Sequence, residues 1–277
     1  MNPSLPRAHD LVWVRSPHDL QWRATPCGSG LPHGGTDAGA ASRPDGWLAE
    51  WLAAGALTPV VVRREATECA NMLPVGIRGS GRHQRQAAYL FIEAVLRITR
   101  PEDLVPGAVC AGHGLLPRAE ARYRACSEPE GKAAAQHSQS CALARLQSAL
   151  VAIAPALNSL GLPWGPTGGL GFALATGLPV LHPGSDLDLV VRAPEPLTQS
   201  QVQALAAAVQ QGDCRVDLQI DTGHAGFSFN EWLSSARRVP EPGNRRGRIL
   251  LKTNTGPVLV NDPWQAHSSQ ACARGAA

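Results

Sequence analysis

The sequence contains little lysine. Of its 25 basic residues only Lys132 and Lys252 are lysines, and the others are arginines. Arginine is the better residue for a forked hydrogen bond to phosphate oxygens. An arginine-rich composition also follows from codon bias, however, and we favour this simpler explanation for the composition as a whole.

Paired cysteines and long apolar runs are missing as well. The seven cysteines are odd in number, scattered and without a C-x-x-C pair, so they indicate neither a disulfide framework nor a zinc site. No apolar run approaches the roughly 18 residues that a transmembrane helix needs. Residues 1–10 lack the apolar segment of a signal peptide. We therefore expect a cytoplasmic protein without a membrane partner.

Strong charge of either sign is absent too. The 277 residues are 44% hydrophobic and 17% charged, with a formal net charge of +3. This composition is typical of a globular protein that buries a sizeable core in one or two domains. So mild a net charge does not call for a nucleic acid as partner, and we expect none.

The most informative segment that is present is an apolar run at residues 183–191 with two aspartates in it. Side chains of a strand alternate between its two faces, so Asp186 and Asp188 share one face while Leu187 and Leu189 point to the core. Two neighbouring carboxylates repel each other unless a cation holds them, and Mg²⁺ prefers oxygen ligands. The pattern predicts that Asp186 and Asp188 hold magnesium; a solvated strand edge or turn is the alternative.

A second acidic strand is predicted at residues 214–221. Its apolar residues alternate with Asp217, Gln219 and Asp221. If this strand pairs beside the first, Asp217 joins the same site, where it would share a metal ion and help to deprotonate an acceptor hydroxyl. Asp221 lies near the end of the strand, and for it we expect a surface role.

A glycine-rich turn precedes both strands, at residues 164–172. Gly168 and Gly169 would present backbone N–H groups to phosphate; the alternative is a turn that the fold requires for itself. Ser185 would either contact phosphate or cap its loop. A glycine-rich turn, an Asp-x-Asp strand and a further aspartate on the next strand follow one another as in a nucleotidyltransferase palm.

The remaining segments mix strands and helices. We predict the α/β (α+β) class: a nucleotidyltransferase-like palm with a mixed sheet and flanking helices, plus a smaller N-terminal domain. The N-terminal domain is expected at residues 1–82 and the catalytic domain at 83–270, with 126–140 as a flexible linker or insertion. Predicted helices cover residues 84–99, 141–160 and 199–211, predicted strands 58–64 and 73–79, and a predicted hairpin 248–260.

Basic residues supply further candidates for phosphate binding. Arg78 and Arg82, with His83 and Arg85, form a compact cluster that would bind phosphates or an acidic protein; a solvated helix start is the alternative. Lys252 lies in a predicted strand and faces away from Leu251, which makes it another phosphate candidate.

Several segments of the chain resemble one known family. It is the family of the phosphoribosyl-dephospho-CoA transferase, also called malonate decarboxylase holo-acyl-carrier-protein synthase, within the nucleotidyltransferase superfamily. The likeness covers most of the chain apart from residues 126–140. It is carried by residues 164–177, 185–189 and 215–219, and further by residues 9–13, 73–79, 251–253 and 262–264 with Arg82 and Arg85.

The resemblance implies a reaction. The donor would be 2′-(5-triphosphoribosyl)-3′-dephospho-CoA, and the acceptor a serine hydroxyl on the acyl-carrier subunit of malonate decarboxylase, with pyrophosphate released. The runner-up is a metal-dependent nucleotidyltransferase that acts on another protein or small-molecule hydroxyl. A third possibility, from another class, is an inactive palm that serves as a binding module, but the presence of Asp186, Asp188 and Asp217 argues against it.

Overall fold

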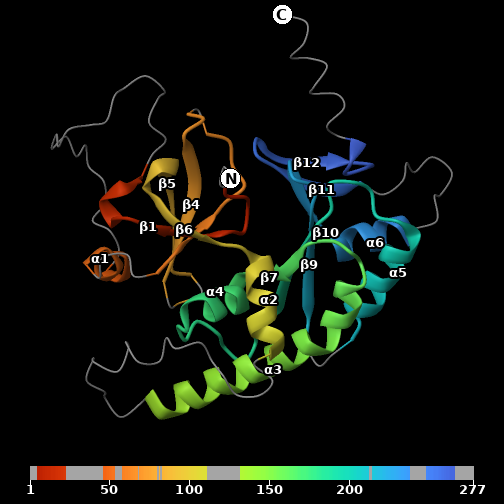
Figure 1. The fold of residues 1–277 in the computed structure, drawn as a ribbon, viewed down its shortest axis with the longest axis horizontal. Helices are drawn as coiled ribbons and strands as arrows, with labels where there is room; N and C mark the ends of the chain where they lie inside the picture. The colour runs from red at the N-terminus through yellow and green to blue at the C-terminus, as the bar shows by residue number, and fades with distance from the viewer. Residues whose placement is uncertain are drawn as a thin grey trace, which may run out of the picture. The chain divides into compact units, whose positions relative to one another are not determined.

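The protein folds into two compact units, Met1–Thr99 and Arg100–Ala277. The computed structural model describes residues 5–22, 46–53, 58–67, 69–79, 81, 83–110, 132–211, 214–237 and 248–265. Each unit contains a six-stranded sheet, and helices accompany both sheets (Figure 1). The expected α/β (α+β) class with a smaller N-terminal domain is therefore confirmed.

The N-terminal unit contains an antiparallel sheet with the strand order β2-β5-β4-β3-β1-β6. One α-helix, α1 (Gly46–Ala53), adds Leu48 to the core of this unit. The strands are β1 (Leu11–Val14), β2 (Leu20–Gln21), β3 (Val60–Val62), β4 (Met72–Arg78), β5 (Arg85–Phe91) and β6 (Val95–Thr99), with the 3₁₀ turns η1 (Pro17–Asp19) and η2 (Ile92–Ala94) between them.

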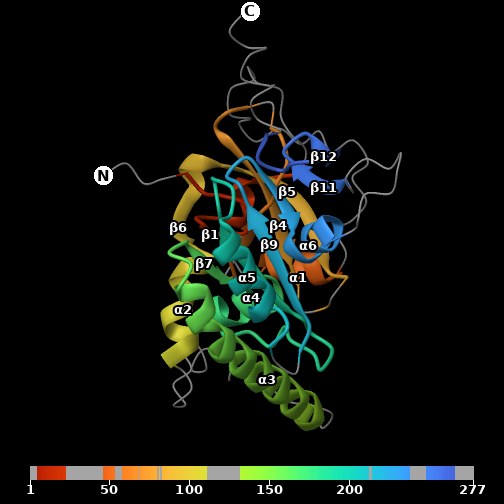
Figure 2. The same ribbon diagram turned by 90° about the vertical axis from the view of Figure 1, so that its right-hand side faces the viewer.

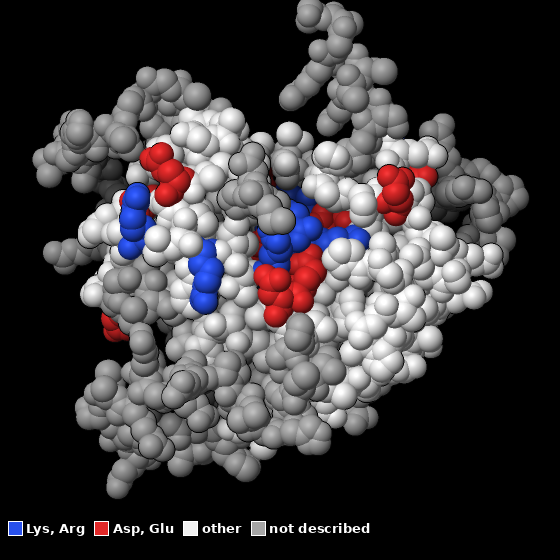
Figure 3. Space-filling model, viewed as in Figure 1, with Lys and Arg blue, Asp and Glu red and all other residues white. Residues whose placement is uncertain are grey.

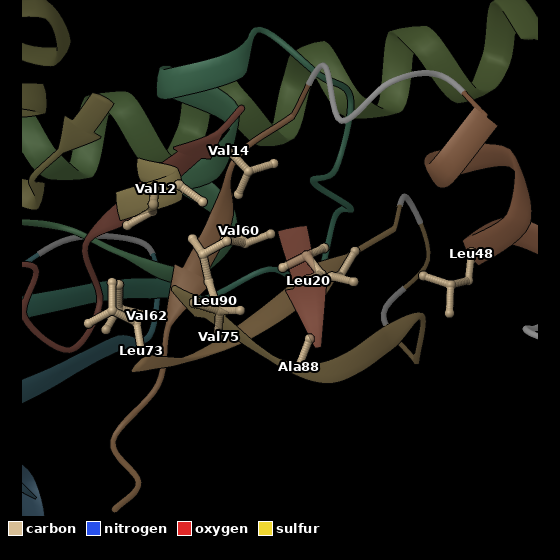
Figure 4. Packing of buried hydrophobic residues seen from close by; sticks show 12 residues of the cluster. Val12, Val14, Leu20, Leu48, Val60, Val62, Leu73, Val75, Ala88 and Leu90 are labelled. Carbon is tan, nitrogen blue, oxygen red and sulfur yellow. The ribbon is translucent and has the colours of Figure 1, made fainter. Parts of the chain in front are cut away.

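The core of this unit is formed by β-branched and aliphatic side chains from alternate strand positions. Val12, Val60, Val75 and Leu90 are fully buried, and Figure 4 shows these side chains together with Leu48 of α1. β-Branched residues suit the pleated, half-buried surface of a strand. Burial of this apolar area is the main term that stabilises the unit.

The helix predicted at residues 84–99 is wrong. β5 pairs with β4 residue by residue, from Met72 opposite Phe91 to Arg78 opposite Arg85, and β6 pairs with β1. The apolar spacing suggested a helix, but Leu96 is 66% exposed, whereas Ala88 and Leu90 alternate toward the core. Because these strands belong to the N-terminal sheet, the chain divides after Thr99 and not after residue 82.

The C-terminal unit contains a mixed sheet with the order β12-β11-β10-β9-β8-β7, in which only β8 and β9 are parallel among the described strands. The helix α5 connects these two strands, and Figures 1 and 2 show how the helices flank the sheet. The elements are α2 (Pro101–Cys110), α3 (Lys132–Asn158), β7 (Trp164–Pro166), α4 (Gly168–Thr176), β8 (Leu187–Arg192), α5 (Gln199–Ala208), β9 (Val216–Asp221), β10 (Ala225–Ser228), α6 (Phe229–Arg237), β11 (Ile249–Thr253) and β12 (Gly256–Val260).

The helix α3 differs from two expectations. Residues 132–140, predicted as part of a linker, are helical, whereas residues 126–131 lie outside the described part of the chain. Its segment Ser140–Asn158 is also long and apolar enough to cross a membrane by length and composition, although we expected no such run. The core helix of a globular protein passes the same test, and one face of this segment, with Leu146, Leu150 and Leu157, is buried in the C-terminal unit.

Candidate active site

The two predicted acidic strands lie side by side. β8 and β9 are parallel, and Asp188 stands directly opposite Asp217 in their register. Their flanking apolar residues, Leu187 and Leu189 on β8 and Leu218 on β9, are buried at the other face. Residues opposite each other in register project to the same side of a sheet. The two carboxylates therefore occupy neighbouring positions on one face, both half-buried.

Asp186 stands one residue before β8 begins. Its side chain is 40% exposed, and its Oδ2 atom lies 4.0 Å from Nη1 of Arg215. The next residue is already tied to the start of β9, because the N–H of Leu187 donates to the carbonyl oxygen of Arg215 at 2.9 Å. Asp186 is thus at the entry of the strand, and its carboxylate also faces a basic partner.

The predicted glycine-rich turn is the junction between β7 and α4. Thr167, the last residue before the helix, donates its N–H to the carbonyl oxygen of Asp188 at 2.9 Å. Gly168 then begins α4 with a φ of +56°, and a Cβ atom there would overlap the carboxylate of Asp188. The first N–H groups of a helix have no partner within it and carry partial positive charge. The structure therefore brings the start of α4, with Gly168 and Gly169, to the acidic strand.

Ser185 has one of its two predicted roles in the structure. Its Oγ accepts a hydrogen bond from the N–H of His182 at 3.0 Å, and its own N–H donates to the carbonyl oxygen of His182 at 2.9 Å. Ser185 therefore caps the loop before β8. A contact between its hydroxyl and phosphate stays a prediction.

Sequence reasoning missed Arg145, which holds this loop. The Nη2 atom of Arg145, on α3, donates to the carbonyl oxygens of Pro183 and Ser185, both at 2.8 Å. A signal for it was present in the sequence, because Arg145 is the only charged residue in the apolar segment Ser140–Asn158.

The donor set suits magnesium only in part. Asp188 and Asp217 offer two adjacent carboxylates, and Mg²⁺ is commonly held by one or two carboxylates together with waters and substrate phosphates. Within the described ranges, however, no group of three or more His, Cys, Asp or Glu side chains lies close enough to hold a metal ion. A complete three-carboxylate cage is therefore not assembled, but the neighbouring pair fits an ion shared with substrate.

Lys252 lies on the same sheet face as the acidic pair but at its far end. In register, Lys252 stands opposite Gly226, and Gly226 opposite Asp221. Asp221 follows Asp217 by four residues on β9, which is about 13 Å along a strand. The structure does not bring Lys252 next to the aspartates.

The predicted basic cluster belongs to the N-terminal unit. Arg78 ends β4 and stands opposite Arg85, the first residue of β5. These residues flank a strand-to-strand connection and not the helix start that was the alternative. Arg82 lies outside the described residues, and contacts of either arginine with phosphate stay predictions.

Asp221 does not have the surface role that we expected. It is 4% exposed, and its carboxylate pairs with Nη1 of Arg192, the residue opposite it in register on β8. The Nε atom of Arg192 also pairs with Glu102 of α2 at 3.2 Å. This buried network ties α2 to the parallel strands β8 and β9. On the exposed surface, Figure 3 shows acidic and basic side chains beside one another on one face of the molecule.

These features define a class of protein. A mixed sheet with two adjacent acidic strands, and a glycine-led helix placed against one of the carboxylates, is the arrangement that the sequence predicts for a transferase with a nucleotidyltransferase-like palm.

Comparison with known proteins identifies the family. Residues 133–263 match the phosphoribosyl-dephospho-CoA transferase MdcG C-terminal domain, and residues 7–101 match the N-terminal domain of the same family. No solved structure matches the chain. Similar proteins named phosphoribosyl-dephospho-CoA transferase occur in Pseudomonas putida (strain W619; 38% identity over 90% of this chain and 94% of the relative), Azotobacter vinelandii (38%, over 93% and 98%) and Klebsiella pneumoniae (strain 342; 35%, over 94% and 97%). The chain belongs to the phosphoribosyl-dephospho-CoA transferase family and is a transferase enzyme.

Proposed function

We propose that the protein transfers the phosphoribosyl-dephospho-CoA group from 2′-(5-triphosphoribosyl)-3′-dephospho-CoA to a serine of the malonate decarboxylase acyl-carrier subunit. The name of the relatives supports the transferred group. The residues that resemble the malonate decarboxylase synthase support the donor and the acceptor. In this reaction the serine oxygen bonds to the α-phosphorus, the bond from that phosphorus to the bridging oxygen breaks, and pyrophosphate leaves with the electron pair.

The observation that carries the proposal is the register of Asp188 and Asp217 on adjacent parallel strands. Transfer at a triphosphate demands compensation of charge that develops on the phosphate oxygens, and it demands an activated hydroxyl. The neighbouring carboxylates of Asp188 and Asp217 would hold Mg²⁺ together with phosphates of the donor, and the ion when bound neutralises the charge of the triphosphate. Asp186 at the strand entry would be a further ligand, although within the described residues its carboxylate does not form a group of three with the other two. Asp217 would in addition accept the proton of the serine hydroxyl.

The start of α4 would bind the leaving phosphates. Gly168 is exposed and Gly169 half-buried, so phosphate oxygens can approach their backbone N–H groups without a side chain in the way. A helix N-terminus favours anions through its unpartnered N–H groups and its dipole. With Asp188 directly beside Gly168, the same place would receive both a magnesium ion and the phosphates that it neutralises.

The basic residues would complete the binding of the substrates. We propose that Arg78 and Arg82 contact the donor's phosphates or an acidic face of the carrier protein. Because Lys252 lies two strands away from β9 and about 13 Å farther along the strand direction than Asp217, it would contact a phosphate of the donor other than those that react.

Mass spectrometry of the carrier protein tests the proposal. The purified enzyme is mixed with apo carrier, donor and Mg²⁺, and the intact carrier is weighed. An increase equal to the phosphoribosyl-dephospho-CoA group, which is lost when the modified serine of the carrier is replaced by alanine, is the expected result. Donor consumption with another acceptor would favour the nucleotidyltransferase alternative, whereas donor binding without any turnover would indicate a binding module.

A further inference from the structure

Arg145 joins α3 to the loop that leads into the first acidic strand. One nitrogen, Nη2, donates to two backbone oxygens, those of Pro183 and Ser185, at 2.8 Å each. The two N–H bonds of this nitrogen are thereby used on two points of the same loop. Charged donors make stronger hydrogen bonds than neutral ones, so this contact restrains the loop more than a backbone pair would.

The loop is closed from within at the same place. The N–H of His182 donates to Oγ of Ser185, and the N–H of Ser185 donates back to the carbonyl oxygen of His182. Beyond the loop, the N–H of Leu187 donates to the backbone carbonyl oxygen of Arg215, just before β9. Asp186 therefore lies between two fixed points, the carbonyl of Ser185 on one side and the amide of Leu187 on the other.

Arg145 lies at the boundary between the buried and the exposed face of α3. The helix segment around it is apolar, its inward residues Leu146 and Ala149 are buried, and Arg145 itself is half-buried. A guanidinium group in such surroundings needs hydrogen-bond partners. The carbonyl oxygens of Pro183 and Ser185 are these partners. A neutral apolar side chain of similar length would leave both oxygens without the N–H donors of Arg145.

We propose that Arg145 is a positioning residue, which fixes the backbone before β8 so that the carboxylate of Asp186 is held at the entry of the strand, two residues before Asp188. The inference rests on the proposed function, because it assigns Asp186 to the magnesium and triphosphate site. Groups that orient a metal ligand typically change metal affinity about 10- to 100-fold when they are removed.

Three variants separate this role from simple stabilisation. Arg145→Met removes the donor while it keeps the length of the side chain, and Arg145→Lys keeps a charged donor. Arg15→Met is the matched control, since Arg15 is an exposed arginine of the N-terminal unit, where it pairs with Asp19. The free energy of unfolding of each variant is measured first, so that all later measurements are made on folded protein.

Hydrogen exchange and metal binding give readouts that do not depend on turnover. In Arg145→Met the amides of Ser185 and Leu187 should exchange faster, while the amide of Leu218 in β9 stays protected. Mn²⁺, used as a paramagnetic substitute for Mg²⁺, should bind about tenfold more weakly. Arg145→Lys should recover part of the affinity, and Arg15→Met should behave as the wild type in both measurements.

A double variant tests whether Arg145 acts through Asp186. If it does, adding Arg145→Met to Asp186→Asn should weaken Mn²⁺ binding no further than Asp186→Asn alone. Additive losses, or unchanged exchange at Ser185 and Leu187, would overturn the inference even if the wild type modifies the carrier. Conversely, a wild type that leaves the carrier unmodified would contradict the proposed function, while the exchange and Mn²⁺ results would still decide the role of Arg145.

Discussion

The carboxylate of Asp188 occupies the space in which a side chain of residue 168 would lie, and Gly168 leaves that space open. The backbone of Gly168 also has a φ of +56°, a conformation that costs other residues roughly 1–2 kcal/mol. Two independent requirements, one of space and one of backbone conformation, thus fix glycine at the point where α4 meets the acidic strand.

Replacing this glycine should damage the site and not only the stability. Gly168→Ala should lower transfer at least tenfold, because the added methyl group displaces the carboxylate of Asp188 or the start of α4. Gly161→Ala is the matched control: Gly161 also has a positive φ, of +67°, but nothing lies within 4 Å of its missing Cβ. Both variants should lose about 1 kcal/mol of stability from backbone strain, and only Gly168→Ala should lose activity. Equal activity of the two variants would contradict the proposed site.

The acidic pair at the first strand should be essential for turnover. Asp186→Asn and Asp188→Asn each remove a negative charge with little change in volume, so each should lower the transfer rate by orders of magnitude while the fold remains. Glu195→Gln, an exposed residue shortly after β8, serves as control and should keep full activity. Rates are measured at several Mg²⁺ concentrations. Wild-type turnover in either aspartate variant at normal Mg²⁺ would remove that residue from the site.

Asp217 should affect chemistry more than donor binding. A serine hydroxyl is a poor nucleophile at neutral pH and needs a base or a metal ion to activate it. The phosphates of the donor would still be held in Asp217→Ala by Asp188 and the start of α4, so single-turnover transfer should fall far more than donor affinity. Gln219→Ala, two residues along the same face of β9, should change neither. Loss of donor binding with normal transfer at saturating donor would make Asp217 a donor ligand.

Arg78 should contribute to affinity for the donor. If it pairs with a phosphate, Arg78→Ala should cost about 2 kcal/mol in donor binding, seen as a higher KM for donor at an unchanged kcat. An unchanged KM would leave Arg78 to the carrier or to solvent. A carrier affinity that falls as ionic strength rises would then favour the carrier, because salt screens exposed charges.

The acidic strands were predictable because their pattern is local. Alternation with period two placed Asp188 and Asp217 on the polar faces of two strands. The helix between the strands left open whether they pair side by side and in which direction, and the structure shows that they are adjacent and parallel. Which residue of β9 stands opposite Asp188 was not predictable, since register depends on pairing across the sheet.

Residues 84–99 show where such reasoning fails. Tyr89, Ile92 and Leu96 have a spacing that also suits a helix, but β5 is fixed as a strand by its pairing with β4. β4 is close to β5 in sequence. The other predicted helical segment, β6, instead pairs with β1, a contact across more than eighty residues that local spacing does not reveal. Arg145 was missed, and Asp221 was wrongly given a surface role, because their partners at Pro183 and Arg192 lie far away in sequence.

The buried pair of Asp221 and Arg192 should matter for stability rather than for the reaction. Removing one member of a buried ion pair usually destabilises a protein by about 3–5 kcal/mol, because the other charge stays behind without full compensation. In Asp221→Asn we expect the lower end of that range, about 3 kcal/mol, since Glu102 still pairs with Arg192. Denaturant unfolding followed by circular dichroism measures the loss.

Arg215→Gln is the control, because its pair with Asp186 is exposed, at 78% and 40%, and exposed pairs contribute little. If the two variants unfold at the same denaturant concentration, the network that joins α2 to β8 and β9 does not stabilise the C-terminal unit.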